Sequence, residues 1–265
     1  MRPPFYSLNE RYFRTISLQS QAYILGFIWA DGTVNPRTGL RIMIQERDIN
    51  ILEYIRQELK SNAPIKIRTI RGMRYADFSV NRKAMNEDLY ALGLASNKSK
   101  DNAAIPNIPS NLLPSFIRGL FDGDGSIWKK DKHYACAFNG GNKFLMWLSE
   151  TLENANIRCN ATRFRYGKDR PASCSIEVTN LSNIRRLKEY MEQNTFSLDR
   201  KTQKLQDASD CSILWDDTHY ATNGIRDKIW SMYKEGLSQK AISDKLLIPY
   251  SSVRGSVQRS RKITT

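Results

Sequence analysis

The sequence is poor in the residues on which metal-binding and disulfide-stabilised proteins depend. Its four cysteines form no Cys-x-x-Cys pair, and its only two histidines, His133 and His219, lie far apart. These features argue against a zinc finger, a histidine-dependent nuclease and a secreted disulfide framework. We expect the thiols to remain reduced, as they do inside cells.

Long hydrophobic runs are also missing. Residues 1–5 contain one Arg and two Pro, and no apolar stretch has the length of a signal peptide or a membrane span. We therefore expect an intracellular protein, in a bacterial or phage-infected cytoplasm or in an organelle, with no membrane partner.

Acidic residues are outnumbered by basic ones. The 265-residue chain has 41 Lys and Arg against 27 Asp and Glu, which gives a net charge of +14. This excess predicts a polyanionic partner, with nucleic acid as the first candidate. The alternative is a soluble protein whose basic character has no functional meaning. The length allows one large domain or two.

Two similar stretches dominate what is present, Ala22–Gly32 and Ser115–Gly125. Both are apolar and helix-like, and both end in Asp-Gly. Each places a small residue at every fourth position, which at helical period forms a ridge of minimal side chains. Because Gly in a helix costs about 1 kcal/mol relative to Ala, we predict that the two helices touch along these ridges. The ridge residues are Ala22, Gly26, Ala30, Ser115, Gly119 and Gly123.

Such packing would make neighbours of Asp31 and Asp124, the aspartates that end the two stretches. Each carboxylate would stand at the negative end of a helix dipole and face a second carboxylate. A divalent cation relieves both problems. Oxygen ligands favour Mg²⁺, which keeps several waters and binds through one or two carboxylates plus phosphate oxygens.

The two stretches resemble the LAGLIDADG signature, since Ile24–Gly32 reads ILGFIWADG and Ile117–Gly125 reads IRGLFDGDG. One copy is weak evidence, because a buried helix closed by a glycine gives a similar string. Two copies at the spacing of a domain repeat favour the family. The chain therefore resembles a single-chain, two-motif LAGLIDADG homing endonuclease.

The pattern of elements also repeats. Residues 1–105 are predicted to form a helix, two strands, a helix, two strands and a helix, and residues 106–204 repeat this order. The predicted fold class is α+β, with two pseudo-twofold-related αββαββα halves and saddle-like antiparallel sheets. An acidic linker, 205–222, and a helical domain, 223–265, follow.

Alternation along the strands predicts one apolar and one basic sheet face in each half. In the strand that begins at Leu40, for example, Arg41, Met43 and Gln45 fall opposite the apolar residues. A two-stranded ribbon of this kind fits the major groove of DNA. The alternative is an ordinary solvated sheet face. The predicted DNA-binding residues are Arg41, Lys66, Arg68, Arg71, Arg74, Arg158, Arg163, Arg165 and Lys168.

The resemblance implies a catalytic site built around Mg²⁺, for which Mn²⁺ or Ca²⁺ could substitute. The implied metal ligands are the carboxylates of Asp31 and Asp124 and the carbonyls of Ala30 and Gly123. Gln45 and Asn139 are implied to position water, and Lys98 and Lys201 are implied to lie beside the metal and water. Lys100 and Arg200 are alternatives to these lysines, and plain phosphate binding is the alternative role.

The two motifs differ at one position, where the first has Trp29 and the second Asp122. We therefore expect the halves to differ, which fits an asymmetric target.

The tail resembles the helix-turn-helix of resolvase and sigma-like domains over Tyr233–Leu246. Its predicted core residues are Ile229, Tyr233, Leu237, Ile242, Leu246 and Val253, and its predicted DNA contacts are Tyr250, Ser251, Ser252 and Arg254. The alternative is a three-helix module that binds protein.

Taken together, the resemblance implies a monomer that makes a metal-dependent double-strand break with short 3′ overhangs in a long, asymmetric DNA target. The alternative is a non-cleaving DNA-binding regulator or an RNA-splicing maturase that keeps the fold for binding alone.

Overall fold

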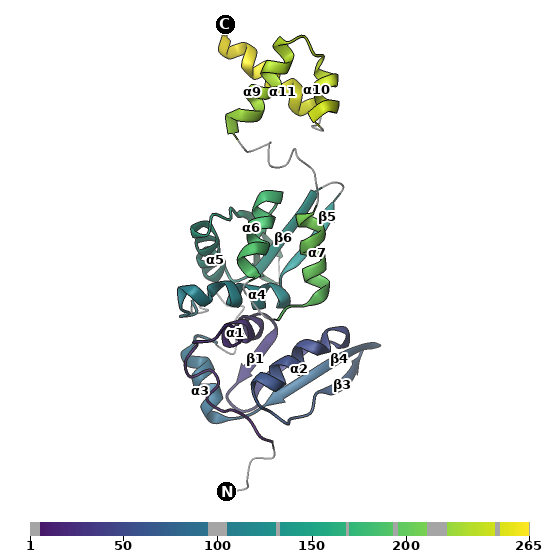
Figure 1. Cartoon of the computed structure of the whole chain (residues 1–265). Helices are drawn as coiled ribbons and strands as arrows, with labels where there is room; N and C mark the ends of the chain where they lie inside the picture. The colour runs from purple at the N-terminus through teal and green to yellow at the C-terminus, as the bar shows by residue number, and fades with distance from the viewer. Residues whose placement is uncertain are drawn as a thin grey trace.

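The computed structural model describes residues 6–94, 105–130, 133–167, 170–192, 196–210, 222–246 and 250–264. Within these ranges the chain forms two α+β units, a helix that packs against them and three further helices (Figure 1). Each unit has one four-stranded antiparallel sheet. No helix of this described part is long and apolar enough to cross a membrane.

The first unit has the predicted order of elements. These are α1 (Gln19–Asp31), β1 (Gly32–Asn35), β2 (Gly39–Gln45), α2 (Ile49–Glu58), β3 (Lys66–Ile70), β4 (Met73–Val80) and α3 (Lys83–Ala91). A 3-10 turn, Glu46–Asp48, precedes α2. The strand order is β1-β2-β4-β3, so the two hairpins pair through β2 and β4.

The second unit repeats this arrangement. Its elements are α4 (Leu113–Gly123), β5 (Ser126–Lys130), β6 (His133–Gly140), α5 (Asn142–Asn154), β7 (Asn160–Gly167), β8 (Arg170–Val178) and α6 (Leu181–Met191). A 3-10 turn, Ser110–Leu112, precedes α4. The strand order β5-β6-β8-β7 is that of the first sheet, which confirms the predicted αββαββα repeat.

One face of each sheet is buried in a hydrophobic core that is shared by the two units. In β2, Leu40, Ile42 and Ile44 are buried, whereas Arg41 is exposed and Gln45 is half-buried. The alternation follows from the pleat of the strand, which turns successive side chains to opposite faces.

The two motif helices meet along their glycines. A Cβ atom at Gly26 would lie 2.0 Å from the carbonyl oxygen of Phe116, and one at Gly119 would lie 1.9 Å from that of Tyr23. Both distances are far below van der Waals contact, so only glycine allows this approach. The predicted contact between the small-residue ridges is therefore confirmed.

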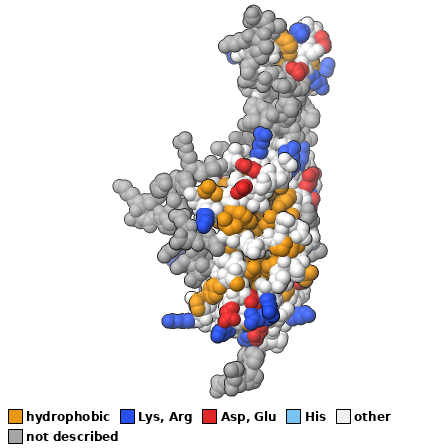
Figure 2. Space-filling model, turned by 90° about the vertical axis from the view of Figure 1, so that its left-hand side faces the viewer, with side chains coloured by type: hydrophobic (Ala, Val, Ile, Leu, Met, Phe, Trp, Pro, Cys, Tyr) orange, Lys and Arg blue, Asp and Glu red, His pale blue; other side chains and the backbone are white. Residues whose placement is uncertain are grey.

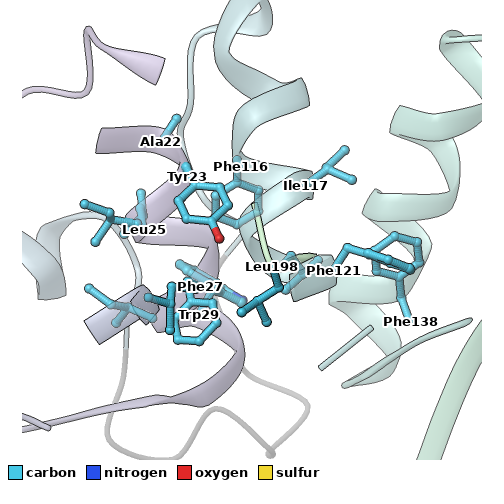
Figure 3. Close-up of a cluster of buried hydrophobic side chains, with 14 of the residues drawn as sticks. Ala22, Tyr23, Leu25, Phe27, Trp29, Phe116, Ile117, Phe121, Phe138 and Leu198 are labelled. Atoms are coloured by element: carbon cyan, nitrogen blue, oxygen red, sulfur yellow. The ribbon is translucent and has the colours of Figure 1, made fainter. Parts of the chain in front are cut away.

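Aromatic side chains pack around this helix contact. Figure 3 shows Tyr23 and Trp29 of α1 beside Phe116 of α4 and Leu198 of the segment before α7. Farther out, the rings of Tyr54 in α2 and Phe196 stack with centroids 4.2 Å apart and planes 5° apart. The chain after α6 therefore returns to the first unit.

The helix α7 (Asp199–Ser209) extends past residue 204, where the sequence placed the end of the second half. Leu205 and Ala208 lie in the core shared by the two units. The first residues of the predicted acidic linker are therefore part of the packed structure. Most of the remaining linker lies outside the described residues.

The tail contains α9 (Thr222–Lys234), α10 (Gln239–Leu246) and α11 (Tyr250–Thr264). Its own small core contains Ile229, Met232, Ile242, Val253 and Val257. Of the predicted core residues, Ile229, Ile242 and Val253 are buried, and Tyr233, Leu237 and Leu246 pack partly buried against them.

Charged and hydrophobic side chains lie in different parts of one side of the molecule (Figure 2). Figure 2 shows the side that carries α3 and α5 in Figure 1. Hydrophobic side chains occupy the middle of this side, and Lys and Arg side chains lie toward its ends beside acidic ones.

We predict that Gly26→Ala and Gly119→Ala each destabilise the protein. Ala is the better helix former by about 1 kcal/mol, but the added methyl would press on the backbone of the opposite helix, and overpacking costs about 1–3 kcal/mol or more. Urea unfolding measures the change. Asn50→Ala, on the exposed face of α2, is the control and should leave stability unchanged or raise it. Gly26→Ala of wild-type stability or above would contradict the close contact.

Candidate active site

The two motif helices end side by side. α1 ends at Asp31, whereas α4 ends at Gly123 and Asp124 follows it as the C-cap residue. A Cβ atom at Gly123 would lie 2.4 Å from the Cβ atom of Ala30 and 3.4 Å from Oδ2 of Asp31. The end of α4 thus touches the Asp31 carboxylate. Asp31 is half-buried and Asp124 is exposed.

The buried side chain of Lys201, in the first turn of α7, binds the end of α4. Its Nζ donates hydrogen bonds to the carbonyl oxygens of Phe121, Asp122 and Gly123 at 2.6, 2.7 and 2.8 Å. These carbonyls have no partner within the helix, and the helix dipole favours a cation there. Lys201 therefore closes the second motif helix.

Burial lowers the pKa of Lys201 to about 8, although the negative charges of Asp122, Asp31 and Asp124 act in the opposite direction. Both motif aspartates are thus close enough to influence the lysine electrostatically. The structure brings Asp31, Asp124 and Lys201 together at the end of the helix pair. Lys98, the proposed counterpart in the first half, lies outside the described residues.

A buried polar network surrounds Asp122. Its Oδ2 accepts hydrogen bonds from Arg118 Nε at 3.1 Å, Tyr23 Oη at 2.9 Å and the Leu198 N–H at 3.0 Å. Arg118 Nη2 also donates to Thr202 Oγ1 at 2.6 Å. Burial raises the pKa of Asp122, whereas Arg118 and the hydrogen bonds to the carboxylate act against this rise. The network ties the segment that carries Lys201 to both motif helices.

The first half has a different chemistry at the matching positions. There Leu25 and Trp29 replace the arginine and the aspartate. The Trp29 ring stacks on Phe144 with centroids 5.8 Å apart and meets Phe116 edge-on at 5.9 Å. One motif helix therefore ends in a polar network and the other in an aromatic cluster, so the halves differ as expected.

A cavity of about 250 Å³ opens beside the helix ends, and Asp31, Gln45, Asp48, Asp122 and Arg200 are among its lining residues. Gln45 and Asp31 therefore face a common space in which a water could be held. Arg200 Nε and Nη2 donate to Asp48 Oδ1 and Oδ2 at 2.9 and 2.8 Å. This ion pair joins the two units, and it places Arg200 on Asp48 rather than on the end of α4.

The donor set suits a hard divalent cation. The carboxylates of Asp31 and Asp124 and the carbonyls of Ala30 and Gly123 are oxygen ligands at two negative helix ends. In the part of the chain that the structure describes, no three His, Cys, Asp or Glu side chains gather as a metal site. A cation held here would therefore complete its shell with water and with phosphate oxygens of a bound nucleic acid.

Among the first-half strand residues, Arg41, Lys66 and Arg68 occupy register positions on one sheet face, opposite the core. All three are exposed. Arg41 and Arg68 both donate hydrogen bonds to Asp77 on β4.

Two further predicted residues do not share this face. Arg71 lies in the turn between β3 and β4 with a φ of 50°. Arg74 lies on the side of β4 that faces the core, but near the start of the strand, where it is exposed. Its Nη2 donates a hydrogen bond to Glu46 Oε1 at 2.7 Å. The prediction that Arg74 lies on the polar face was wrong, because alternation within β4 places it on the same side as the buried Ala76 and Phe78.

In the second half, Asn139 is exposed near the end of β6, where it pairs with Ser175. Arg158 lies before β7, and its N–H donates to Asn183 Oδ1 at 3.3 Å. Arg163 and Arg165 fall in β7 where its pairing with β8 is irregular. Lys168 lies outside the described residues.

On the tail, the predicted contacts lie in the first turns of α11. Tyr250 and Arg254 are exposed and Ser252 is half-buried, while Ser251 has a helical backbone. These residues begin α11, the helix that follows α10 in the chain.

Some residues of the site were missed in the sequence. Arg118 and Asp122 have the i, i+4 spacing of a helical ion pair, so this pair was detectable. The partners Tyr23 and Leu198 were not, because their contact with Asp122 depends on tertiary packing. The ion pair of Asp48, in the turn before α2, carried no sequence signal either.

Together, a twofold αββαββα repeat, a glycine-lined helix contact and two aspartates at its end define a class of fold. Comparison with family models and with curated proteins found no match. Solved structures do match. The LAGLIDADG homing endonuclease I-GzeII in complex with its DNA target has a TM-score of 0.50 at 14% identity, over 80% of this chain and 96% of that chain. A point mutant of I-SmaMI has a TM-score of 0.50 at 14% identity, over 78% and 95%.

Full-length DUF199/WhiA from Thermatoga maritima matches over 96% of this chain and 95% of its own, with a TM-score of 0.48 and 16% identity. At these identities the comparisons concern the fold. The chain has the two-repeat α+β fold of LAGLIDADG proteins.

We predict a pH-dependent stability term from Lys201. Its pKa falls from 10.5 to about 8 on folding, so between these values the unfolded chain binds more protons and stability rises with pH. The rise that this lysine contributes should be on the order of 2–3 kcal/mol. Urea unfolding at pH 7 and pH 10 should show it in the wild type, and Lys201→Met should lose it.

The control for this measurement is Lys83→Met, which changes an exposed lysine on α3. It should keep the wild-type dependence on pH, including the part that comes from other groups. Equal pH slopes for wild type and Lys201→Met would contradict a titrating buried lysine.

Proposed function

We propose that the protein is a site-specific, metal-dependent DNA endonuclease that makes a double-strand break with short 3′ overhangs. The observation that carries this proposal is the placement of Asp31 and Asp124 at two touching helix ends, beside Lys201. A fold that only needed a buried helix pair would gain nothing from two acids at its exposed end.

The proposed roles follow from position. Asp31 and Asp124, with the carbonyls of Ala30 and Gly123, would hold Mg²⁺, for which Mn²⁺ or Ca²⁺ could substitute. The bound ion would activate water and relieve charge on the scissile phosphate. Gln45, in the cavity beside Asp31, would orient a water, with Asn139 as its counterpart. Lys201, and Lys98 in the first half, would lower the negative potential near the phosphate.

Several features support double-stranded DNA as the substrate. The net charge of +14 favours a polyanion, and exposed arginines lie on the polar face of the first sheet. The matched I-GzeII structure is of a complex with a DNA target. One chain supplies both halves, so a monomer suffices. The tail, as a helix-turn-helix, would lengthen the footprint and add affinity through tethering.

One observation favours a second candidate, a protein of this fold that binds DNA or RNA without cleaving it. The Gly123 carbonyl, a proposed metal ligand, already accepts a hydrogen bond from Lys201. A buried ammonium can replace part of the charge compensation that a metal would provide. Regulation of transcription or assistance of RNA splicing would then be the role.

A metal-dependence assay separates these candidates. Plasmids carrying DNA that flanks the coding sequence are incubated with the protein in Mg²⁺ and, in parallel, in EDTA. Linear product in Mg²⁺ alone supports the endonuclease, and end sequencing then locates the cut and its overhang. Tight binding without cleavage in either condition, or rescue of RNA splicing, supports the second candidate.

We predict that Asp31→Asn and Asp124→Asn each reduce double-strand cleavage at least about a hundredfold. Each wild-type carboxylate would hold the cation that stabilises the charge of the transition state, and the amide would hold it less well. Binding measured in Ca²⁺ should persist in both variants. Asp88→Asn is the control. Asp88 lies on α3 and forms an ion pair with Arg11, and this variant should cleave normally. Full activity of either motif variant would remove that carboxylate from the mechanism.

Deletion of the tail from Asn223 onward should weaken DNA binding and flatten its dependence on salt, because phosphate contacts set that slope. Fluorescence anisotropy between 50 and 200 mM salt, roughly the range over which such contacts are resolved, tests this. An unchanged slope together with loss of a protein partner would instead identify the tail as a protein-binding module.

A further inference from the structure

A buried carboxylate lies in the middle of the polar face of the first sheet. Asp77 on β4 is only 3% exposed, although its face points away from the core. Arg41 Nε and Nη2 donate to its Oδ1 and Oδ2 at 2.8 and 3.0 Å, and Arg68 Nε donates to Oδ2. The two arginines therefore cover the acid.

The strand register explains this arrangement. Asp77 pairs with Met43 on β2 and with Lys66 on β3. Arg41 lies two residues before Met43 and Arg68 two residues after Lys66, so the arginines approach the acid from opposite diagonals. Diagonal neighbours on one sheet face are within reach of long side chains.

The carboxylate is ionised and strongly bound. Burial by itself raises the pKa of Asp77, but hydrogen bonds and charge from Arg41 and Arg68 outweigh burial and lower the pKa. Hydrogen bonds between ionised partners are short and directional. Both guanidinium groups are thereby held in place on side chains that remain 45% and 50% exposed.

The hydrogen bonds to Asp77 use one edge of each guanidinium group. Arg41 donates to Asp77 from Nε and from one hydrogen of Nη2, and its Nη2 makes a further, weak contact with Met43 Sδ at 3.6 Å. Arg68 spends Nε. In both, the Nη1 side remains for a partner. For Arg68 the end-on edge of Nη1 and Nη2 matches the two acceptors O6 and N7 of guanine in the major groove, whereas Arg41, whose Nη2 contacts Met43 Sδ, can donate to one of these acceptors through Nη1.

We propose that Arg41 and Arg68, positioned by Asp77, form a preformed reader of guanine bases in one half of the DNA target. The inference rests on the proposed binding of DNA and is independent of cleavage. Asp77 is a positioning residue, since the arginines cover it and the arginines make the contact. An acid that faced the phosphates would repel them, whereas an acid beneath two arginines restricts their rotation.

The second half supplies a matched contrast. Asp77 pairs with Lys66, the first residue of β3, and Glu177 pairs with Asn160, the first residue of β7. Glu177 therefore occupies the equivalent position on the second sheet.

The neighbours of this glutamate differ. Ala135 has the register of Arg41, and Thr162 has that of Arg68. The second sheet has no arginine at these two register positions, so we assign this paired guanine readout to the first half. The asymmetry then extends from the helix ends to the sequence that each half recognises.

The test compares full-length wild type with Asp77→Asn in selection from randomised duplexes in EDTA, which prevents cleavage. The wild type should enrich guanine at two positions on one side of the target. Asp77→Asn should lose about tenfold of this discrimination, since each well-oriented contact is worth that much or more. Its affinity for non-specific DNA should stay equal or rise, because a negative charge is removed.

Glu177→Gln is the control, because it makes the same charge change on the other sheet. It should raise non-specific affinity to a similar extent and leave the guanine preference intact. Thermal unfolding of each variant reports whether it is folded.

If Asp77→Asn fails to fold, Arg41→Lys and Arg68→Lys replace it, since they keep the charge and remove the forked edge. Each should lose the guanine preference at one of the two positions. An unchanged guanine preference in Asp77→Asn, or in both Arg41→Lys and Arg68→Lys, overturns the inference. So does a wild type that binds a defined sequence without a guanine preference. A wild type that binds no DNA overturns the proposed function instead.

Discussion

The contact between the backbones of α1 and α4 is the constraint on which the rest of the structure depends. At Gly26 and Gly119 the opposing carbonyl oxygens occupy the space where a side chain would begin. This contact makes the two helices end side by side, and it thereby places Asp31 next to Gly123. The sheets, in turn, take their positions from the helices above them. The placement of the helix ends and of the sheets therefore depends on one packing interaction.

Around this symmetric centre the two halves have diverged in their polar groups. The second helix ends in a network of Asp122, Arg118 and Lys201, while Trp29 fills the matching space in the first half with an aromatic ring. On the sheets, in contrast, the polar cluster described above is in the first half, where Arg41 and Arg68 bind Asp77. A buried ionic network contributes little net stability but strongly penalises the loss of one partner. Such networks are therefore expected where a particular geometry is needed.

The sequence was informative wherever a local period controls the outcome. Small residues at every fourth position predicted the helix contact, and alternation in β2 predicted which face is buried. Contacts between distant segments, such as the Leu198 N–H with Asp122, have no period and were missed. The acidic composition after Leu205 does not reveal that Leu205 and Ala208 of α7 pack into the shared core. The partners of Asp77 depend on the register between three strands, which alternation within one strand does not reveal.

The burial of α1 has a consequence for biosynthesis. Every residue of this helix from Ala22 to Trp29 is buried, so it is apolar on all sides. Part of that surface is covered only by α4, which leaves the ribosome after about ninety more residues have been added. Until then the face of α1 that contacts α4 at Gly26 has no partner in the nascent chain. Transiently exposed apolar surface of this kind favours aggregation, so the first half is fully packed only once α4 has been made.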